Sequence, residues 1–362
     1  MFSRFLGNSH VVTALQSMLA EQRLPQTLLF AGPAGVGKAT LARLLAAALN
    51  CKPGPAEACG KCTHCRRILA ADPSLPYYQK LFEERAGLTL EKRRENPLVV
   101  STHPEFLCFP PDGPLPQISI EQVRRLKNYA QFGPSEGRRR VFLVDQADRI
   151  DTAAANSLLK TLEEPPPYLT LVITSENAYD LLPTIRSRCV PFFFGPLSAS
   201  EMEQFLASRA EIGADDRRRL AAWAQGSPGR ALAIDIEVYE RRREAMLALL
   251  RAGARASDFG DVIRHTEVIG RNKHEKLELQ LDVLYGLLQD LLRLEAEPGA
   301  GSAGEKRQVI NEDIRDQLAS LAAKVDFQWL ERAVSKVDEL DSHARRNIQK
   351  QIALEAFAVS LR

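Results

Sequence analysis

The sequence predicts an α/β domain built around a phosphate-binding loop, followed by a helical C-terminal half. An apolar run at residues 27–31 leads through a glycine-rich turn into a helical stretch at 41–50, which is the strand–loop–helix order that a phosphate-binding loop requires. Strand and helix patterns alternate as far as residue 174, as in a doubly wound and mostly parallel sheet. From residue 197 onward helical periodicity dominates, interrupted by a loop rich in Pro, Gly and Ala at 295–305.

Length and composition narrow the class of protein. The 362 residues are too many for one ordinary compact domain and indicate two or three. Lys and Arg number 48 against 46 Asp and Glu, so the net charge of +2 gives no overall signature of polyanion binding. The chain starts without the apolar segment of a signal peptide, and no apolar run approaches the roughly eighteen residues of a membrane span. We expect a soluble cytoplasmic protein whose 6 cysteines are reduced or bound to metal.

The glycine-rich loop at 32–40 reads Gly-Pro-Ala-Gly-Val-Gly-Lys-Ala-Thr. Its glycines let backbone N–H groups converge on a phosphate at a helix N-terminus, and Lys38 supplies a positive charge. The next position should carry a hydroxyl that ligates Mg²⁺, but it is Ala39, and Thr40 lies about 100° further around the helix. The candidate nucleotide-binding residues of this loop are Gly32, Gly35, Val36, Gly37, Lys38, Ala39 and Thr40.

A second nucleotide-site residue, Asp145, follows the apolar strand at 141–144 and can hold Mg²⁺ through water. An active ATPase of this architecture needs a glutamate next, to polarise the attacking water. Gln146 stands there instead, and an amide cannot take a proton at neutral pH. We therefore expect ATP or ADP to bind without hydrolysis, while Ala39 argues against bound Mg²⁺. The alternative is that the glycines form a purely structural turn.

Four closely spaced cysteines form the pattern Cys51-x7-Cys59-x2-Cys62-x2-Cys65. In a reducing compartment such a cluster favours tetrahedral thiolate coordination of Zn²⁺, and four protein ligands leave no open position for catalysis. His64 lies inside the knuckle, but the cysteines already fill the coordination shell. The sequence therefore predicts a structural zinc knuckle, the alternative being four free thiols.

An arginine, Arg188, follows the strand at 169–174 within the run Arg-Ser-Arg-Cys. An arginine just beyond a strand is usually a surface cation. In an oligomeric ATPase it can instead reach the γ-phosphate of a neighbouring subunit, as an arginine finger supplied in trans.

Several motifs together resemble the clamp-loader branch of the AAA+ family, and within it the delta-prime type of bacterial DNA polymerase III subunit. The most specific is the helix at 151–166, which reads Asp-Thr-Ala-Ala-Ala-Asn-Ser-Leu-Leu-Lys-Thr-Leu-Glu-Glu-Pro-Pro. The Ser-Arg-Cys signature at 187–189, Thr-His-Pro-Glu at 102–105, Gly-Ser-Pro-Gly at 226–229 and the zinc knuckle follow in the family's order. The resemblance is strong over residues 1–235 and only architectural beyond them.

The resemblance implies three domains. They are an AAA+ P-loop domain over 1–195, with the zinc knuckle at 51–65 and a charged insertion at about 72–101, a small helical lid domain over 196–238, and an all-α collar domain over 239–362.

The resemblance also implies a role as a non-hydrolysing scaffold subunit of the replicative clamp loader, with Arg188 as the arginine finger. Its expected partners are motor subunits of the gamma/tau type and the delta subunit. The complex would reach the sliding clamp and primer-template DNA as part of the DNA polymerase III holoenzyme, a DNA-directed DNA polymerase. Gly229 departs from the motor subunits, which tend to carry a sensing arginine at that position.

Two other classes of function remain open. One is a self-sufficient AAA+ motor, either a motor-type loader subunit or a branch-migration helicase, and Ala39 and Gln146 count against it. The other is a nucleic-acid-binding zinc protein. The near-zero net charge and the few aromatic residues near the knuckle count against that reading.

Overall fold

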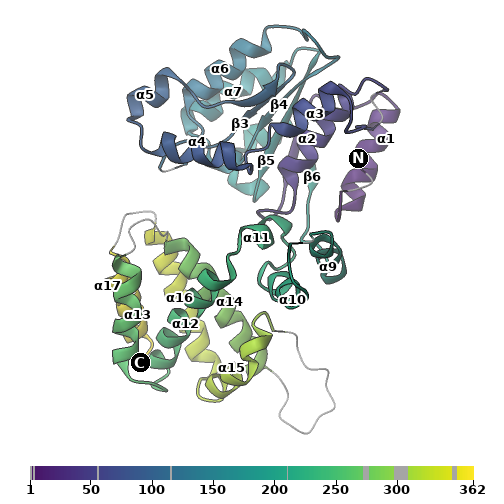
Figure 1. The fold of residues 1–362 in the computed structure, drawn as a ribbon. Helices are drawn as coiled ribbons and strands as arrows, with labels where there is room; N and C mark the ends of the chain where they lie inside the picture. Colours follow the sequence, from purple (N-terminus) through teal and green to yellow (C-terminus); the bar gives the residue numbers. More distant parts are fainter. Residues whose placement is uncertain are drawn as a thin grey trace. The chain divides into compact units, whose positions relative to one another are not determined.

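The computed structural model describes residues 2, 5–54, 57–114, 116–209, 211–271, 277–296, 309–344 and 349–362 (Figure 1). The chain divides into two compact units. Unit 1 consists of residues 1–205 and 227–229, and unit 2 of residues 206–226 and 230–362.

Unit 1 contains one six-stranded sheet in the order β2-β3-β4-β5-β1-β6. The strands are β1 (Thr27–Ala31), β2 (Val100–His103), β3 (Phe106–Phe109), β4 (Arg140–Val144), β5 (Leu169–Ser175) and β6 (Val190–Phe193). Every neighbouring pair is parallel except β2 and β3, which are antiparallel. The mostly parallel α/β sheet predicted from the alternating pattern is confirmed.

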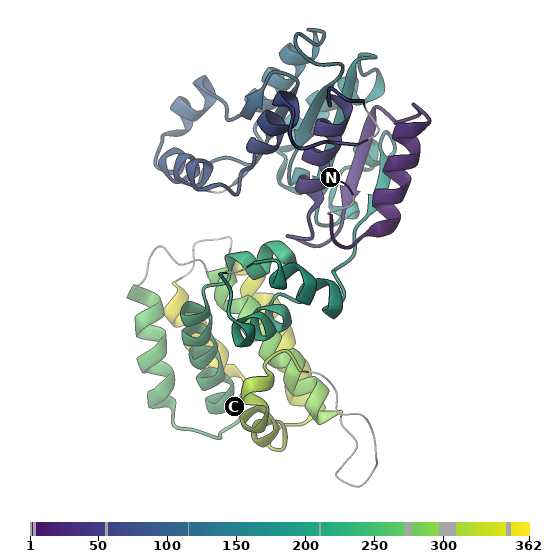
Figure 2. The ribbon, with the colours of Figure 1, turned by 45° about the vertical axis from the view of Figure 1, so that its right-hand side comes forward.

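Different helices cover the two faces of this sheet, and each face has its own apolar core (Figure 1, Figure 2). Leu28 and Phe30 of β1 belong to one core and Leu29 and Ala31 to the other, because successive side chains of a strand point to opposite faces. Helices α1 (Ser9–Ala20), α2 (Lys38–Leu49) and α3 (Thr63–Ala70) build the first core. The second is built by α6 (Ile120–Ala130), η2 (Ala147–Arg149), α7 (Thr152–Glu163), η3 (Ala178–Asp180) and α8 (Pro183–Arg186).

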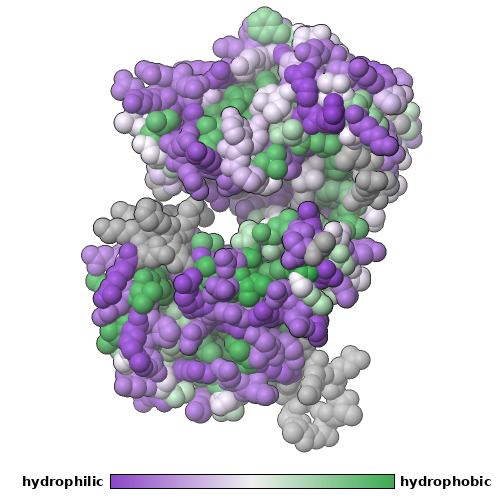
Figure 3. All heavy atoms as spheres, in the orientation of Figure 1, coloured by the Kyte–Doolittle hydropathy of each residue, from purple (hydrophilic) through white to green (hydrophobic). Residues whose placement is uncertain are grey.

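The charged insertion contains two helices, α4 (Pro76–Ala86) and α5 (Leu90–Glu95). It is fixed to the rest of unit 1 by a buried ion pair, in which Arg85 donates from Nε and Nη2 to the two carboxylate oxygens of Asp112 at 3.0 and 2.6 Å. Arg43 of α2 pairs with Asp72, at the start of the insertion, at 2.7 Å. The insertion is therefore a packed part of unit 1. Hydrophilic residues cover much of the face of unit 1 seen in Figure 3, with apolar residues interspersed.

Unit 2 is helical, and its described residues contain no strand. Its helices are α10 (Ala214–Trp223), α12 (Ile236–Gly253), α13 (Phe259–Arg271), α14 (Leu277–Glu295), η4 (Glu312–Ile314), α15 (Arg315–Ala322), α16 (Phe327–Ala344) and α17 (Lys350–Ser360), while α9 (Ala199–Ala207) and α11 (Pro228–Ala233) each span a unit boundary. One apolar core packs α12 to α17 together, with Leu249 and Leu250 of α12 and Leu284 and Leu287 of α14 fully buried. The predicted helical C-terminal half is confirmed.

Two further sequence predictions concern the loop at 295–305 and membrane-spanning helices. Most of the loop predicted at 295–305 lies outside the described residues. Among the residues that are described, no helix has the length and apolar character needed to cross a membrane.

A buried carboxylate, Glu105, ties the turn between β2 and β3 to the start of β4. Its Oε1 accepts the backbone N–H groups of Ser135, Glu136 and Gly137 at 2.6, 2.9 and 3.3 Å. Its Oε2 lies 3.2 Å from Nε of Arg140, which is also buried. Burial raises the pKa of Glu105, but the backbone N–H groups outweigh burial and hold the pKa below its usual value.

We expect Glu105→Gln to destabilise unit 1 by about 3 kcal/mol, because Arg140 would keep a buried positive charge without its partner. Hydrogen exchange of the β3 and β4 amides would measure the loss. A carboxyl group whose pKa is lowered on folding contributes stability above its unfolded pKa of about 4.3, and this contribution disappears as the pH falls through the folded pKa. Acidification below about pH 4 should therefore destabilise the wild type more than the variant.

Glu136→Gln is the matched control. Glu136 is exposed, pairs with Arg67 at 2.7 Å and lies 4.0 Å from Nε2 of His103, so the loss of its charge should cost under about 1 kcal/mol. Equal losses in the two variants would contradict the structural role of Glu105.

Candidate functional site

The phosphate-binding loop connects β1 to α2, and its three glycines adopt backbone conformations that other residues rarely reach. Gly32, Gly35 and Gly37 have φ angles of 148°, 73° and 98°. A Cβ atom at Gly32 would lie 2.2 Å from the carbonyl oxygen of Phe194, so backbone crowding also requires glycine there. The loop thus has the glycine-dependent turn that its sequence indicates.

Lys38 is directed at the loop's own backbone. Its ammonium group donates to the carbonyl oxygens of Gly32 and Pro33, at 2.5 and 2.7 Å. Burial lowers the pKa of Lys38, and the negative charges of Glu176 and Asp145 oppose this shift. A phosphate would have to compete with two carbonyl oxygens for this ammonium group.

Neither of the two positions after the lysine presents a hydroxyl group for a metal. Ala39 packs against the apolar core. The hydroxyl of Thr40 accepts a hydrogen bond from Nη2 of Arg43 at 3.3 Å, and Arg43 in turn pairs with Asp72. The structure therefore gives Thr40 a different partner from the metal that a P-loop hydroxyl normally ligates.

Asp145 and the phosphate loop lie at the same edge of the sheet, because β1 and β4 run in the same direction and both precede their functional residues. The hydroxyl of Thr174, in β5, donates to Oδ1 of Asp145 at 2.6 Å and accepts the backbone N–H of Gln146 at 2.8 Å. Burial raises the pKa of Asp145, while this hydrogen bond and the charges of Arg43 and Lys38 lower it. Asp145 is thus engaged within the chain.

A contact that sequence reasoning missed covers the outer side of the phosphate loop. Ser227 Oγ donates to the carbonyl oxygen of Ala34, and the N–H of Gly229 donates to the carbonyl oxygen of Gly35, both at 2.9 Å. A Cβ atom at Gly229 would lie 2.9 Å from Cα of Gly35. The Gly-Ser-Pro-Gly run at 226–229 was the available signal, and the close backbone approach explains why residue 229 is glycine.

The four cysteines of the knuckle meet at one point. The sulfur atoms of Cys51, Cys59, Cys62 and Cys65 all lie within 4.8 Å of one another, and none forms a disulfide. Tetrahedral zinc with Zn–S bonds of about 2.3 Å needs sulfur atoms about 3.8 Å apart. Backbone N–H groups of Cys62 and Lys61 point at the sulfur of Cys59 and lower its pKa to about 6. These donors favour the thiolate of Cys59, which is the ligand form, whereas burial raises the pKa of Cys51 and Cys65. The close approach of the four sulfur atoms is therefore the observation that lets the cluster hold zinc.

His64 takes no part in the cysteine cluster. Its Nδ1 lies 2.7 Å from Nε2 of His103, and Glu136 completes a group of three possible metal ligands. Nδ1 of His103 accepts the backbone N–H of Glu105 at 3.1 Å, so the proton of the neutral ring sits on Nε2 and is donated to His64. A metal-bound His103 would need its proton on Nδ1, facing another donor. The pair is therefore a hydrogen bond between two rings.

Arg188 lies at the amino ends of the parallel strands, whereas the phosphate loop lies at their carboxyl ends. It immediately precedes the residues that lead into β6, and its carbonyl oxygen accepts a hydrogen bond at 2.5 Å from the hydroxyl of Thr27, the first residue of β1. The loop begins after the last residue of β1, about 16 Å away for a five-residue strand. An arginine side chain cannot span that distance, so Arg188 cannot serve the phosphate loop of its own chain.

The guanidinium group of Arg188 is held by neighbouring residues. Nε and Nη2 donate to Oε1 of Glu163 at 3.0 and 2.5 Å, and Nη1 donates to the carbonyl oxygen of Thr184 at 2.8 Å. The side chain is still 31% exposed. Sequence reasoning identified Arg188 but not Glu163.

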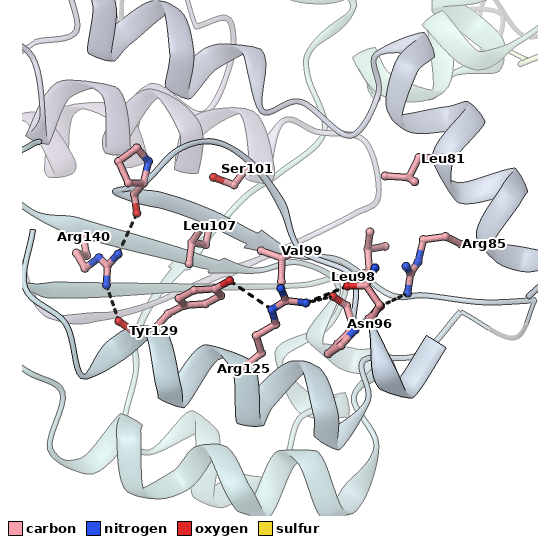
Figure 4. Close-up of a pocket in the computed structure, with 12 residues that line it drawn as sticks. Leu81, Arg85, Asn96, Leu98, Val99, Ser101, Leu107, Arg125, Tyr129 and Arg140 are labelled. Carbon is pink, nitrogen blue, oxygen red and sulfur yellow. Dashed lines mark hydrogen bonds between the residues drawn. The ribbon is translucent and has the colours of Figure 1, made fainter. Parts of the chain in front are cut away.

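A cavity of about 430 Å³ lies where the insertion meets β2, β3 and α6 (Figure 4). Three arginines line it, and each is engaged within the chain. Arg85 pairs with Asp112, Arg125 donates to the hydroxyl of Tyr129 at 3.3 Å, and Arg140 donates to the carbonyl oxygen of Tyr129 at 2.5 Å. None of the predicted site residues lines this cavity. Arg85 and Arg125 connect the insertion to Asp112 and to α6, while Arg140 connects β4 to α6.

Comparison with known proteins places the chain in a family. Residues 7–198 match the sequence model of the family described as DNA polymerase III, delta subunit. The chain is 32% identical over 232 residues to the DNA polymerase III subunit tau/gamma of Haemophilus influenzae, covering 62% of this chain and 29% of that protein. It is 28% identical over 389 residues to the subunit gamma/tau of Mycobacterium tuberculosis, covering 99% and 60%. A solved gamma subunit-related protein of Thermotoga maritima aligns with a TM-score of 0.43 at 14% identity, covering 96% of this chain and 98% of that one.

The chain thus spans less than two thirds of the length of these curated relatives. The family match alone covers more than half of this chain. The predicted relation to the clamp-loader subunits of DNA polymerase III is confirmed at this level, and the chain belongs to the DNA polymerase III delta-subunit family.

Proposed function

We propose that this chain is a non-hydrolysing scaffold subunit of a bacterial clamp loader, of the delta-prime type. It supplies Arg188 in trans to the ATP site of a neighbouring subunit while the sliding clamp is loaded onto primed DNA. The observation that carries this proposal is the position of Arg188 at the amino ends of the parallel strands, whereas the chain's own phosphate loop lies at their carboxyl ends. An arginine there can only act on a phosphate that another chain holds.

The chain's own nucleotide site supports the non-hydrolysing part of the proposal. Ala39 offers no hydroxyl to a metal, and Gln146 offers no base to an attacking water. The backbone at Gly229 approaches the loop too closely for an arginine side chain to stand there without rearrangement. ATP or ADP, if bound, would remain unhydrolysed.

The cofactor and partners of the proposed subunit follow from the same assignment. Zn²⁺ would be structural and held by the four cysteines of the knuckle. The protein partners of this chain would be gamma/tau-type motor subunits and the delta subunit. The chain would reach the clamp and primer-template DNA through the complex, in the cytoplasm. The division into a P-loop domain, a lid domain and a collar domain at residues 195 and 238 stays a prediction.

A second candidate is a motor-type loader subunit that hydrolyses ATP itself. It is favoured by the names of the matched relatives, which are tau and gamma subunits. The composition of the nucleotide site counts against it, because both Ala39 and Gln146 would have to be compensated.

We expect the purified chain to bind ATP or ADP weakly and to release no phosphate, since the hydroxyl and the base needed for hydrolysis are both missing. A phosphate-release assay on the isolated chain measures this, with Lys38→Ala as the control for contaminating ATPases. Rapid turnover that Lys38→Ala abolishes would favour the motor-type subunit instead.

We expect Arg188→Ala to leave folding intact and to slow ATP hydrolysis by the reconstituted loader. An arginine finger contributes roughly 10³–10⁵ to the rate at the site it serves. Arg186→Ala is the matched control, because Arg186 lies two residues away and stacks on Tyr179 at 4.7 Å. An unchanged rate in Arg188→Ala would mean that Arg188 is only a surface cation.

We expect one zinc ion per chain after gentle purification, measured by elemental analysis. Cys59→Ala should lose the metal, because a structural site needs all four thiolates. Cys189→Ala is the control, since that cysteine lies outside the cluster and should leave zinc content unchanged. Metal-free protein with four reactive thiols at 51–65 would rule out the site.

A further inference from the structure

We propose that Glu163 is a positioning residue for Arg188. The inference rests on the proposed function, because it concerns how Arg188 would be presented to the phosphate of a neighbouring subunit. Glu163 touches no reacting group itself and would act through the arginine.

The contacts of the guanidinium group show what Glu163 does. A guanidinium has five N–H donors. Glu163 Oε1 accepts one from Nε and one from Nη2, while the carbonyl oxygen of Thr184 and, at 3.3 Å, the hydroxyl of Ser187 accept those of Nη1. One N–H on Nη2 has no partner among the residues that the structure describes. The carboxylate thus fixes the plane of the guanidinium and leaves part of it available.

Glu163 stands on a rigid element. It is the last residue of α7, whose Leu158 and Leu162 are buried in the core and whose first turn is capped by the side chain of Asp151. The backbone of Arg188 is fixed independently, by the hydrogen bond from Thr27. The arginine is therefore held at both ends by parts of the sheet and its covering helix.

This ion pair contributes little to stability, because both side chains are partly exposed, at 31% for Arg188 and 48% for Glu163. The ion pair instead fixes the orientation of the Arg188 guanidinium group. A free arginine side chain samples many rotamers, and a group that acts on a transition state is effective only when it is already in place. The structure thus indicates that Glu163 restricts the rotamers of the Arg188 side chain.

The test is ATP hydrolysis by the loader reconstituted with variants of this chain. We expect Glu163→Ala to lower the hydrolysis rate at the ATP site that Arg188 serves roughly 10- to 100-fold, the order of loss that misplacement of a reacting group by about 1 Å causes, with little change in KM. Glu163→Gln should retain more activity, because the amide oxygen can still accept both hydrogen bonds. Glu164→Ala is the matched control: it removes an exposed charge one residue along, and no hydrogen bond joins Glu164 to Arg188 among the described residues.

The double variant separates positioning from a structural role. Glu163→Ala should have no further effect in an Arg188→Ala background, because Glu163 acts only through the arginine. An additional loss in that background, or an increase in rate in Glu163→Ala, would overturn the inference. If Arg188→Ala slows hydrolysis and Glu163→Ala does not, this inference alone fails. If Arg188→Ala itself has no effect, the proposed function fails first.

Discussion

Parallel strands in the sheet of unit 1 separate Arg188 from the phosphate loop and Asp145. The phosphate loop and Asp145 follow the carboxyl ends of β1 and β4, whereas Arg188 precedes the amino end of β6. The central strands β1 and β5 are buried throughout, and the five residues of β1 separate its two ends by about 16 Å, which is more than an arginine side chain can span. A chain with this topology can complete an ATP site with Arg188 only by meeting a second chain, and our proposal of a subunit that acts in trans rests on this constraint.

The phosphate loop has the glycine-dependent turn that its sequence predicts, and the polar groups in and around it form hydrogen bonds within the chain. Lys38 is satisfied by loop carbonyl oxygens and Asp145 by Thr174. Ser227 and Gly229 donate to carbonyl oxygens on the loop's outer side. Buried polar groups need such partners, and Lys38 and Asp145 are the two groups that a phosphate and its metal would otherwise use. A nucleotide would have to displace several of these contacts, which is the physical reason to expect weak binding.

Local patterns in the sequence predicted those features that depend on neighbouring residues. The strand–loop–helix at 27–50 and the cysteine knuckle at 51–65 are of this kind. The strands β2 and β3 were missed, because four residues are too few to show a period. The contact of Gly229 with the phosphate loop and the pairing of Glu163 with Arg188 join residues far apart in the sequence, and no periodicity encodes such contacts.

Two features of unit 1 fix its elements to one another, namely the Glu105–Arg140 ion pair and the cysteine knuckle. Glu105 joins the β2–β3 turn to β4, and Cys51 of the knuckle lies two residues after the end of α2, the helix that begins at the phosphate loop. Zinc held by the knuckle would therefore brace the end of α2 that is remote from the loop. A motor subunit must move as it hydrolyses ATP, whereas a subunit that holds Arg188 ready for a neighbour gains from staying fixed. Such a fixed framework would suit the proposed subunit to present an arginine in one orientation.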